Sequence, residues 1–111
     1  LFPSRSRQLP SLLAMHSELL AAVLPGLEKE LQTCAFSSPA EGVIFVSCLS
    51  GARETLEVAT PAYWLSHDTA RPVKFDLAMR SLAELSCTVY LEIGPRPLLL
   101  PLGQSCIGQS A

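Results

Sequence analysis

The chain contains two histidines, His16 and His67, and histidine is the side chain best suited to move protons near neutral pH. His16 directly precedes Ser17, a favoured helix N-cap residue that stands in front of a helical apolar pattern. The positive end of the helix dipole disfavours an imidazolium beside it and therefore favours a neutral base. A neutral imidazole can activate a hydroxyl or thiol nucleophile. His16 is thus a candidate general base, although a lone histidine at a helix start is more commonly a surface or capping residue.

The four cysteines lie far apart in apolar surroundings, without a Cys-x-x-Cys pair or a histidine at ligand spacing: Cys34, Cys48, Cys87 and Cys106. We expect buried, reduced thiols rather than a disulfide framework or a metal site. A hydrolase built on a cysteine and a histidine is a weaker alternative, because it needs an exposed thiol in electropositive surroundings, which none of these segments offers.

Composition bounds the size and the class of the protein. With 111 residues, 49% of them hydrophobic, the chain can bury one small core and forms one domain or part of one. The formal charge is −2 and the arginines are scattered, so no basic stripe suited to nucleic acid exists. No apolar run reaches the roughly 18–20 residues that span a bilayer, and no signal-peptide pattern is present. We expect a soluble, cytoplasmic protein without nucleic-acid or membrane partners. Because it begins with Leu1 rather than Met, we also expect either that it was cut from a longer protein or that its upstream part is not shown.

Apolar spacing predicts four helices. The first begins after Ser17 and is interrupted near Pro25-Gly26. Two more are opened by Pro61 and Pro72, since proline suits the first helical turn. The last is short and covers residues 98–102. The third helix has a predicted buried stripe of Phe75, Ala78, Met79, Leu82 and Leu85.

Two segments have the composition of strands. Residues 43–49 (VIFVSCL) are apolar on both faces, which predicts a strand in a parallel sheet covered by helices. Residues 88–93 (TVYLEI) form the second predicted strand and are followed by Gly94-Pro95. The resulting order of helices and strands is typical of an α/β layer fold. Residues 1–10 have no apolar period and predict a connecting segment that enters the domain from outside.

Three stretches, in the same order, resemble the acyltransferase domains of polyketide synthases, relatives of the malonyl-CoA:acyl carrier protein transacylases. Residues 9–20 (LPSLLAMHSELL) are similar to the family's LPVSHAFHSPLM. Residues 62–67 (AYWLSH), followed by 71–75 (RPVKF), look like EYWVRHLREPVRF. Residues 91–99 (LEIGPRPLL) look like LEIGPHPVL. Each motif alone is weak, whereas three in sequence, covering residues 9 to about 102, are fairly specific.

The resemblance implies an α/β-hydrolase-like large subdomain with parallel strands covered by helices. In that family a ferredoxin-like small subdomain is inserted before the catalytic histidine. Residues 1–10 then correspond to the segment that returns from the small subdomain, and residues 11–111 to the C-terminal part of the large subdomain.

The resemblance also assigns site residues. His16 corresponds to the catalytic base, and His67 to a polar residue whose backbone carbonyl holds the ring of that base. Counting back from Pro72 instead places Asp68 at the orienting position, because this chain has one residue more than the family before the proline. Leu13 and Met15 are substrate-binding positions where malonyl-selective members have His and Phe, which loosens any inference about the acyl group.

The activity implied is transfer of an acyl group, malonyl-type by resemblance, from coenzyme A through an active-site serine to the phosphopantetheine thiol of an acyl carrier protein. No metal or other cofactor is needed. The sequence lacks the Gly-x-Ser-x-Gly of the serine nucleophile, so an upstream segment must supply it. The alternative is a non-catalytic, acyltransferase-like scaffold or docking domain of a megasynthase.

Two interpretations, one structural and one functional, are open for each of four further residues: Tyr63, Trp64, Glu92 and Arg96. We expect Tyr63 and Trp64 to pack and seat their helix. For Glu92 we favour a hydrogen bond to loop backbone at Gly94 over a role as an acid, and for Arg96 a solvated surface position over a phosphate contact. Cys48 stands where the family's SNVTG has Asn, and the sequence alone offers no reason for that change.

Overall fold

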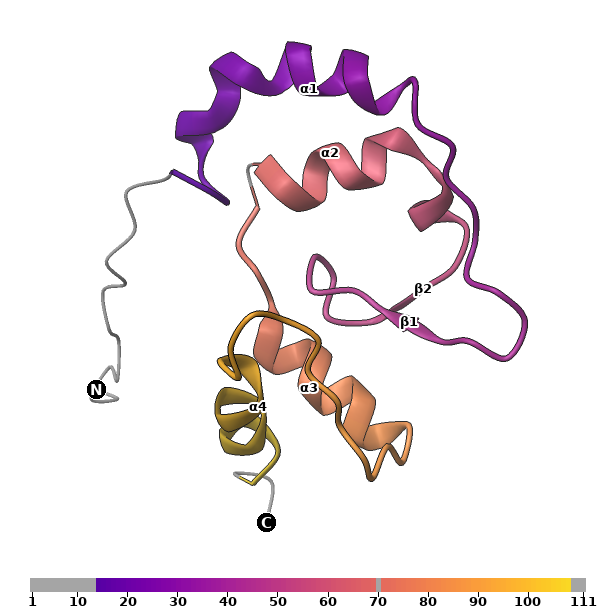
Figure 1. Cartoon of the computed structure of the whole chain (residues 1–111), viewed down its shortest axis with the longest axis vertical. Helices are drawn as coiled ribbons and strands as arrows, with labels where there is room; N and C mark the ends of the chain where they lie inside the picture. The colour runs from indigo at the N-terminus through magenta and orange to yellow at the C-terminus, as the bar shows by residue number, and fades with distance from the viewer. Residues whose placement is uncertain (1–13, 70, 109–111) are drawn as a thin grey trace.

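The computed structural model describes residues 14–69 and 71–108, a mixed α/β arrangement of short elements (Figure 1). In chain order they are η1 (Glu18–Val23), α1 (Leu24–Leu31), β1 (Phe45–Val46), β2 (Arg53–Glu54), η2 (Glu57–Ala59), α2 (Pro61–Thr69), α3 (Phe75–Glu84) and α4 (Leu99–Ile107). The connecting segment predicted for residues 1–10, and Leu13, lie outside the described residues.

The predicted interruption of the first helix is confirmed. A 3₁₀ segment, η1, leads into α1, and Pro25 lies in the first turn of α1, where a missing N–H removes no helical hydrogen bond. Ser17 occupies the N-cap position of η1, but its hydroxyl makes no capping bond and instead donates to the Ala14 carbonyl at 2.6 Å. The predicted capping hydrogen bond is therefore wrong.

The sheet differs from the expectation. β1 pairs with β2 in antiparallel register, Phe45 opposite Glu54 and Val46 opposite Arg53, and this is the only sheet of the described part of the chain. A tight turn follows β1, in which the Gly51 N–H donates to the Ser47 carbonyl at 2.8 Å. A short turn returns the chain beside itself and makes the strands antiparallel, whereas parallel strands need a long crossover. The expected parallel pairing is thus not made within the described residues.

The second predicted strand, residues 88–93, forms no strand pair within that part of the chain. Three of its apolar side chains are largely exposed: Val89 by 86%, Leu91 by 83% and Ile93 by 92%. Its composition suits a strand, but the neighbour that would complete a ladder is not among the described residues.

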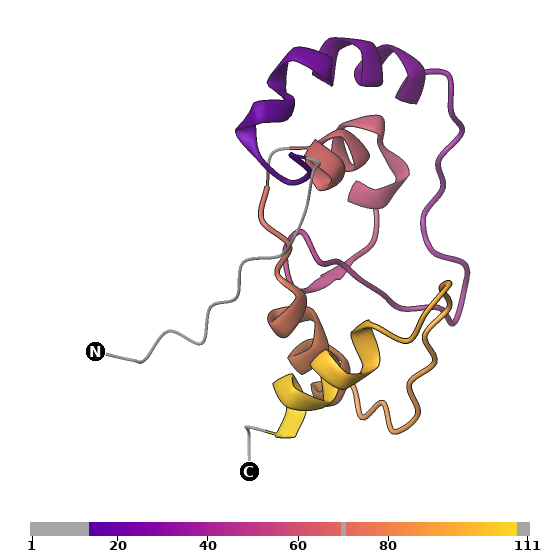
Figure 2. The same ribbon diagram turned by 60° about the vertical axis from the view of Figure 1, so that its left-hand side comes forward.

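Two groups of helices flank the hairpin. α1 packs on α2, and α4 packs on α3, an arrangement seen in both views (Figures 1 and 2). α3 begins at Phe75 rather than at Pro72, because its N-cap residue, Lys74, has non-helical backbone angles of φ −92° and ψ 56°. The Lys74 N–H donates to the Cys48 carbonyl at 2.7 Å. Ala78 and Met79 of its predicted stripe are buried, while Leu85 at the end of the stripe is 41% exposed. α4 is longer than the predicted 98–102.

The packing role predicted for Tyr63 and Trp64 is confirmed. The Trp64 ring stacks on Phe36 with centroids 6.0 Å apart, and its indole N–H donates to the Val58 carbonyl at 2.8 Å. Tyr63 is 7% exposed and meets Phe45 edge to face at 6.3 Å. This aromatic cluster fixes α2 against the hairpin and against the segment that follows α1.

Candidate active site around His16

His16 lies in a turn just before η1. The side chain is half-buried, and the backbone has a φ of 58°, in the left-handed region. Met15 beside it is 51% exposed, which leaves its side chain accessible to a ligand. The structure thus places a partly accessible imidazole on a constrained turn.

α2 is the helix that packs beside the His16 turn and η1. η1 packs against α2, and Figures 1 and 2 show the two side by side. His67 and Asp68 belong to the last part of α2, and their side chains lie outside the described part of the structure. The hydrogen bond expected between the His67 carbonyl and the His16 ring stays a prediction, as does the alternative through Asp68.

A fully buried serine, Ser47, ties the hairpin turn to α2, and sequence reasoning missed it. Its hydroxyl is hydrogen-bonded to the Tyr63 hydroxyl and accepts the Leu49 N–H at 2.9 Å. Burial raises the pKa of Tyr63, and the hydrogen bond from Ser47 opposes that shift. Because the buried hydroxyl bonds to groups on both elements, Ser47 holds α2 in position against the hairpin turn. The available signal was the polar Ser47 inside an otherwise apolar run.

The structure shows a main-chain contact at Cys48, and nothing in it explains why this chain has cysteine there. The Cys48 carbonyl accepts the Lys74 N–H, just before the start of α3. Burial raises the pKa of the half-buried Cys48 thiol. Because the observed link is made by the backbone, this link itself does not require an asparagine side chain at position 48.

Glu92 anchors the start of α4. Its two carboxylate oxygens accept the N–H groups of Leu98, Leu99 and Leu100 at 2.9 to 3.1 Å. The bond from the Leu99 N–H is the main cause that lowers the pKa of Glu92. An anion is stabilised at a helix N-terminus, where N–H groups have no helical partners. Glu92 does hydrogen-bond to the backbone, as predicted, but the partners are these N–H groups and not Gly94. Arg96 is exposed, as expected.

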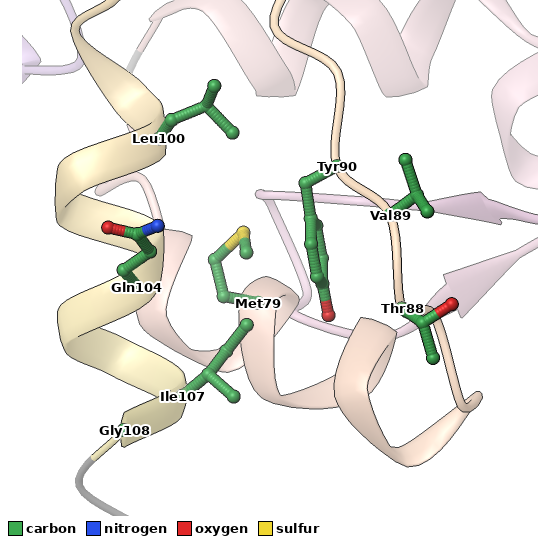
Figure 3. A pocket seen from close by; sticks show the side chains of 8 residues that line it. All are labelled: Met79, Thr88, Val89, Tyr90, Leu100, Gln104, Ile107 and Gly108. Atoms are coloured by element: carbon green, nitrogen blue, oxygen red, sulfur yellow. The ribbon is translucent and has the colours of Figure 1, made fainter.

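A pocket of about 630 Å³ lies between α3, α4 and residues 88–90 (Figure 3). Met79, Tyr90, Leu100 and Ile107 give it an apolar lining. The Tyr90 ring lies on the side of its backbone that faces Met79, and Val89 points to the other side (Figure 3). The pocket belongs to the α3–α4 half of the molecule and not to the η1–α2 half that carries His16 (Figure 1).

The cysteines are free, but they are not buried as expected. Cys34 and Cys87 are exposed, and Cys48 and Cys106 are half-buried. Among residues 14–69 and 71–108, no three His, Cys, Asp or Glu side chains are grouped so as to hold a metal ion. No helix in the same ranges is long and apolar enough to cross a membrane.

Comparison with known proteins points to one class of enzyme. No protein-family model matches the chain. The polyketide synthase GfsB of Streptomyces halstedii is 30% identical to it over 108 residues, 96% of this chain and 2% of that protein. Relatives at about 30% identity over most of this chain are polyketide synthases. The PKS-NRPS hybrid synthetase acdB of Aspergillus candidus is 28% identical over 96% of this chain and 4% of its own length. The spectinabilin polyketide synthase system protein NorB of Streptomyces orinoci is 31% identical over 86% of this chain and 4% of its own length.

The similarity to these polyketide synthases covers most of this chain. The chain, however, spans only 2–4% of the length of these relatives. At 96% coverage the part similar to GfsB is long enough to include both the His16 turn and α2. The likeness therefore concerns the candidate site together with the elements that position it.

Proposed function

We propose that this chain is the C-terminal part of an acyltransferase domain of a polyketide synthase, with an α/β-hydrolase-like large subdomain completed by another segment. The observation that carries the proposal is the set of three acyltransferase-like motifs, in order, within a stretch whose homologues are polyketide synthases. The aromatic packing of Tyr63 and Trp64 supports it, because the second motif then has a structural role that positions α2 beside the His16 turn.

In the proposed reaction His16 acts twice as a base. It accepts the proton of the serine hydroxyl while the serine oxygen attacks the acyl thioester of coenzyme A, and it returns the proton to the departing thiolate. In the second half it accepts the proton of the phosphopantetheine thiol of an acyl carrier protein. That sulfur attacks the acyl-serine ester, and the proton returns to the serine oxygen. The serine comes from a Gly-x-Ser-x-Gly segment that this sequence does not contain.

Orientation of the base is assigned to the end of α2. The His67 carbonyl would accept a hydrogen bond from the His16 ring and fix its tautomer, the role that a carboxylate has in a serine-histidine-aspartate triad. Met15 and Leu13 would border the acyl group. The exposed half of the Met15 side chain is compatible with such a contact.

The exposed apolar segments support completion by another part of the polypeptide. Val89, Leu91 and Ile93 are more than four-fifths exposed, and Val43 and Ile44 before β1 are exposed by 57% and 45%. Exposed apolar side chains gathered in short segments are typical of a surface that contacts another segment or chain. In the proposed domain, residues 88–93 pair with a strand of the serine-bearing segment, which supplies the parallel sheet that the described residues do not form alone.

The test is acyl transfer by this chain together with a Gly-x-Ser-x-Gly segment taken from the sequence upstream of it. The assembled protein should become acylated at the serine by malonyl-CoA, as seen by mass spectrometry, and should pass the group to a carrier protein. His16→Ala should lower the transfer rate at least about a hundredfold, because general-base catalysis contributes about 10²–10⁴-fold. Transfer within about threefold of the wild-type rate would exclude His16 as the base. If the upstream sequence has no such serine, a non-catalytic scaffold role replaces this proposal.

A further inference from the structure

The backbone at His16 has a conformation that residues with a side chain rarely adopt. Its φ of 58° lies in the left-handed region, where a non-glycine residue is uncommon and persists only when its surroundings hold it. The backbone angles set the direction of the Cα–Cβ bond, so this conformation decides where the imidazole can reach. A feature that holds the turn would therefore also aim the ring.

Ser17 makes a hydrogen bond that fits this role. Its hydroxyl donates to the Ala14 carbonyl at 2.6 Å, and this bond closes the turn of residues 14–17 with His16 inside it. Ser17 itself is extended, with φ −139° and ψ 159°, and its carbonyl accepts the Leu20 N–H at 3.2 Å where η1 begins. Because the hydroxyl does not cap η1, its bond serves the turn rather than the helix.

We propose that Ser17 is a positioning residue whose hydroxyl holds the left-handed turn at His16 and thereby aims the imidazole; the inference rests on the proposed role of His16 as the general base. Without the bond to Ala14, the His16 backbone is free to relax toward negative φ, which redirects the side chain. Misplacement of a catalytic group by about 1 Å can lower a rate by about a hundredfold. A partial relaxation should therefore reduce turnover and leave binding of the acyl-CoA nearly unchanged.

A matched pair of variants isolates the hydroxyl. Ser17→Thr and Ser17→Val have nearly the same shape and both suit extended backbone, but only threonine keeps the donor. In the acyltransferase assembled with the serine-bearing segment, Ser17→Thr should keep kcat within about threefold of wild type. Ser17→Val should lower kcat about tenfold, with the KM for malonyl-CoA within about twofold. If the valine variant does not fold, as judged by circular dichroism, Ser17→Ala takes its place.

A double-mutant cycle separates positioning from general support of the fold. If Ser17 acts through His16, Ser17→Val should have no further effect on the residual rate of the His16→Ala protein. An equal loss in both backgrounds overturns the inference, and so does equal activity of the threonine and valine variants. In those two cases a large effect of His16→Ala still upholds the proposed function. Unchanged transfer by His16→Ala refutes the proposed function itself and, with it, the positioning role.

Discussion

The bare face of residues 88–93 allows a test of whether another segment completes the domain. The perturbation is the triple variant Val89→Thr, Leu91→Thr and Ile93→Thr, which places a β-branched residue of high strand propensity at each position. In this chain the three positions are 86%, 83% and 92% exposed, so the substitutions remove contacts only where something covers them.

The expected magnitude follows from that exposure. Fully burying one such side chain contributes about 1.5–3 kcal/mol, so covering all three contributes about 4–8 kcal/mol. Threonine keeps one methyl group, and the triple variant should therefore destabilise the assembled protein by at least about 2 kcal/mol. That is a large part of the roughly 5–15 kcal/mol by which whole domains are stable. In the isolated chain the same side chains are mostly exposed, so the substitutions should leave its helical content, measured by circular dichroism, nearly unchanged.

The assay combines urea denaturation of the assembled protein with binding of a hydrophobic dye by both forms. The triple variant should lower the denaturation midpoint of the assembly and reduce dye binding by the isolated chain. Leu56→Thr is the control, because Leu56 is 72% exposed and lies outside this segment. An unchanged midpoint for the assembled triple variant would refute the reasoning, since it would mean that nothing covers this face.

Four further outcomes are expected. Residues 1–111 alone should bind a hydrophobic dye and unfold without cooperativity, whereas a sharp two-state transition would count against completion by another segment. His67→Gln should reduce acyl transfer by less than about tenfold, since the substitution keeps the backbone carbonyl. If Asp68→Asn abolishes transfer while His67→Gln has no effect, the Asp68 carboxylate and not the His67 carbonyl orients the base. Ser47→Ala or Tyr63→Phe should each destabilise the assembled protein by about 1–3 kcal/mol and the double variant by no more than either one. Because burial raises the pKa of Tyr63 above its usual 10.0, the stability due to that phenol should be present below pH 10 and lost as the pH rises through the raised value. Two outcomes would contradict that pairing: additive losses of stability in the Ser47→Ala and Tyr63→Phe double variant, or a loss of stability at alkaline pH that is the same in Tyr63→Phe as in the unaltered protein. Since the pKa of Glu92 is lowered, its hold on α4 should be present above the usual pKa of a glutamate and lost as the pH falls through the lowered value. Hydrogen exchange of the α4 amides should therefore rise in acid and lose this dependence in Glu92→Gln, and identical acid profiles would show that Glu92 does not hold the helix.

The sequence by itself determined the features that depend on neighbours close in the chain. Helical spacing located α1 and the stripe of α3, and the prolines marked the interruption before α1 and the start of α2, because these signals lie within a few residues of one another. The packing role of Tyr63 and Trp64 was likewise predictable, since large aromatic side chains stabilise a small core wherever they can be buried.

Only the tertiary structure decided which groups pair across the chain. Ser47 meets Tyr63 sixteen residues away, and the Cys48 carbonyl accepts the Lys74 N–H just before α3, which begins at Phe75 and not at Pro72. The local pattern of residues 43–49 and 88–93 indicates strands but does not say which segments pair with them. It therefore could not predict that the first forms an antiparallel hairpin and that the second has exposed apolar side chains. The hydroxyl of Ser17 and the carboxylate of Glu92 could each reach several backbone groups, and the turn at His16 and the start of α4 decide which ones they bond.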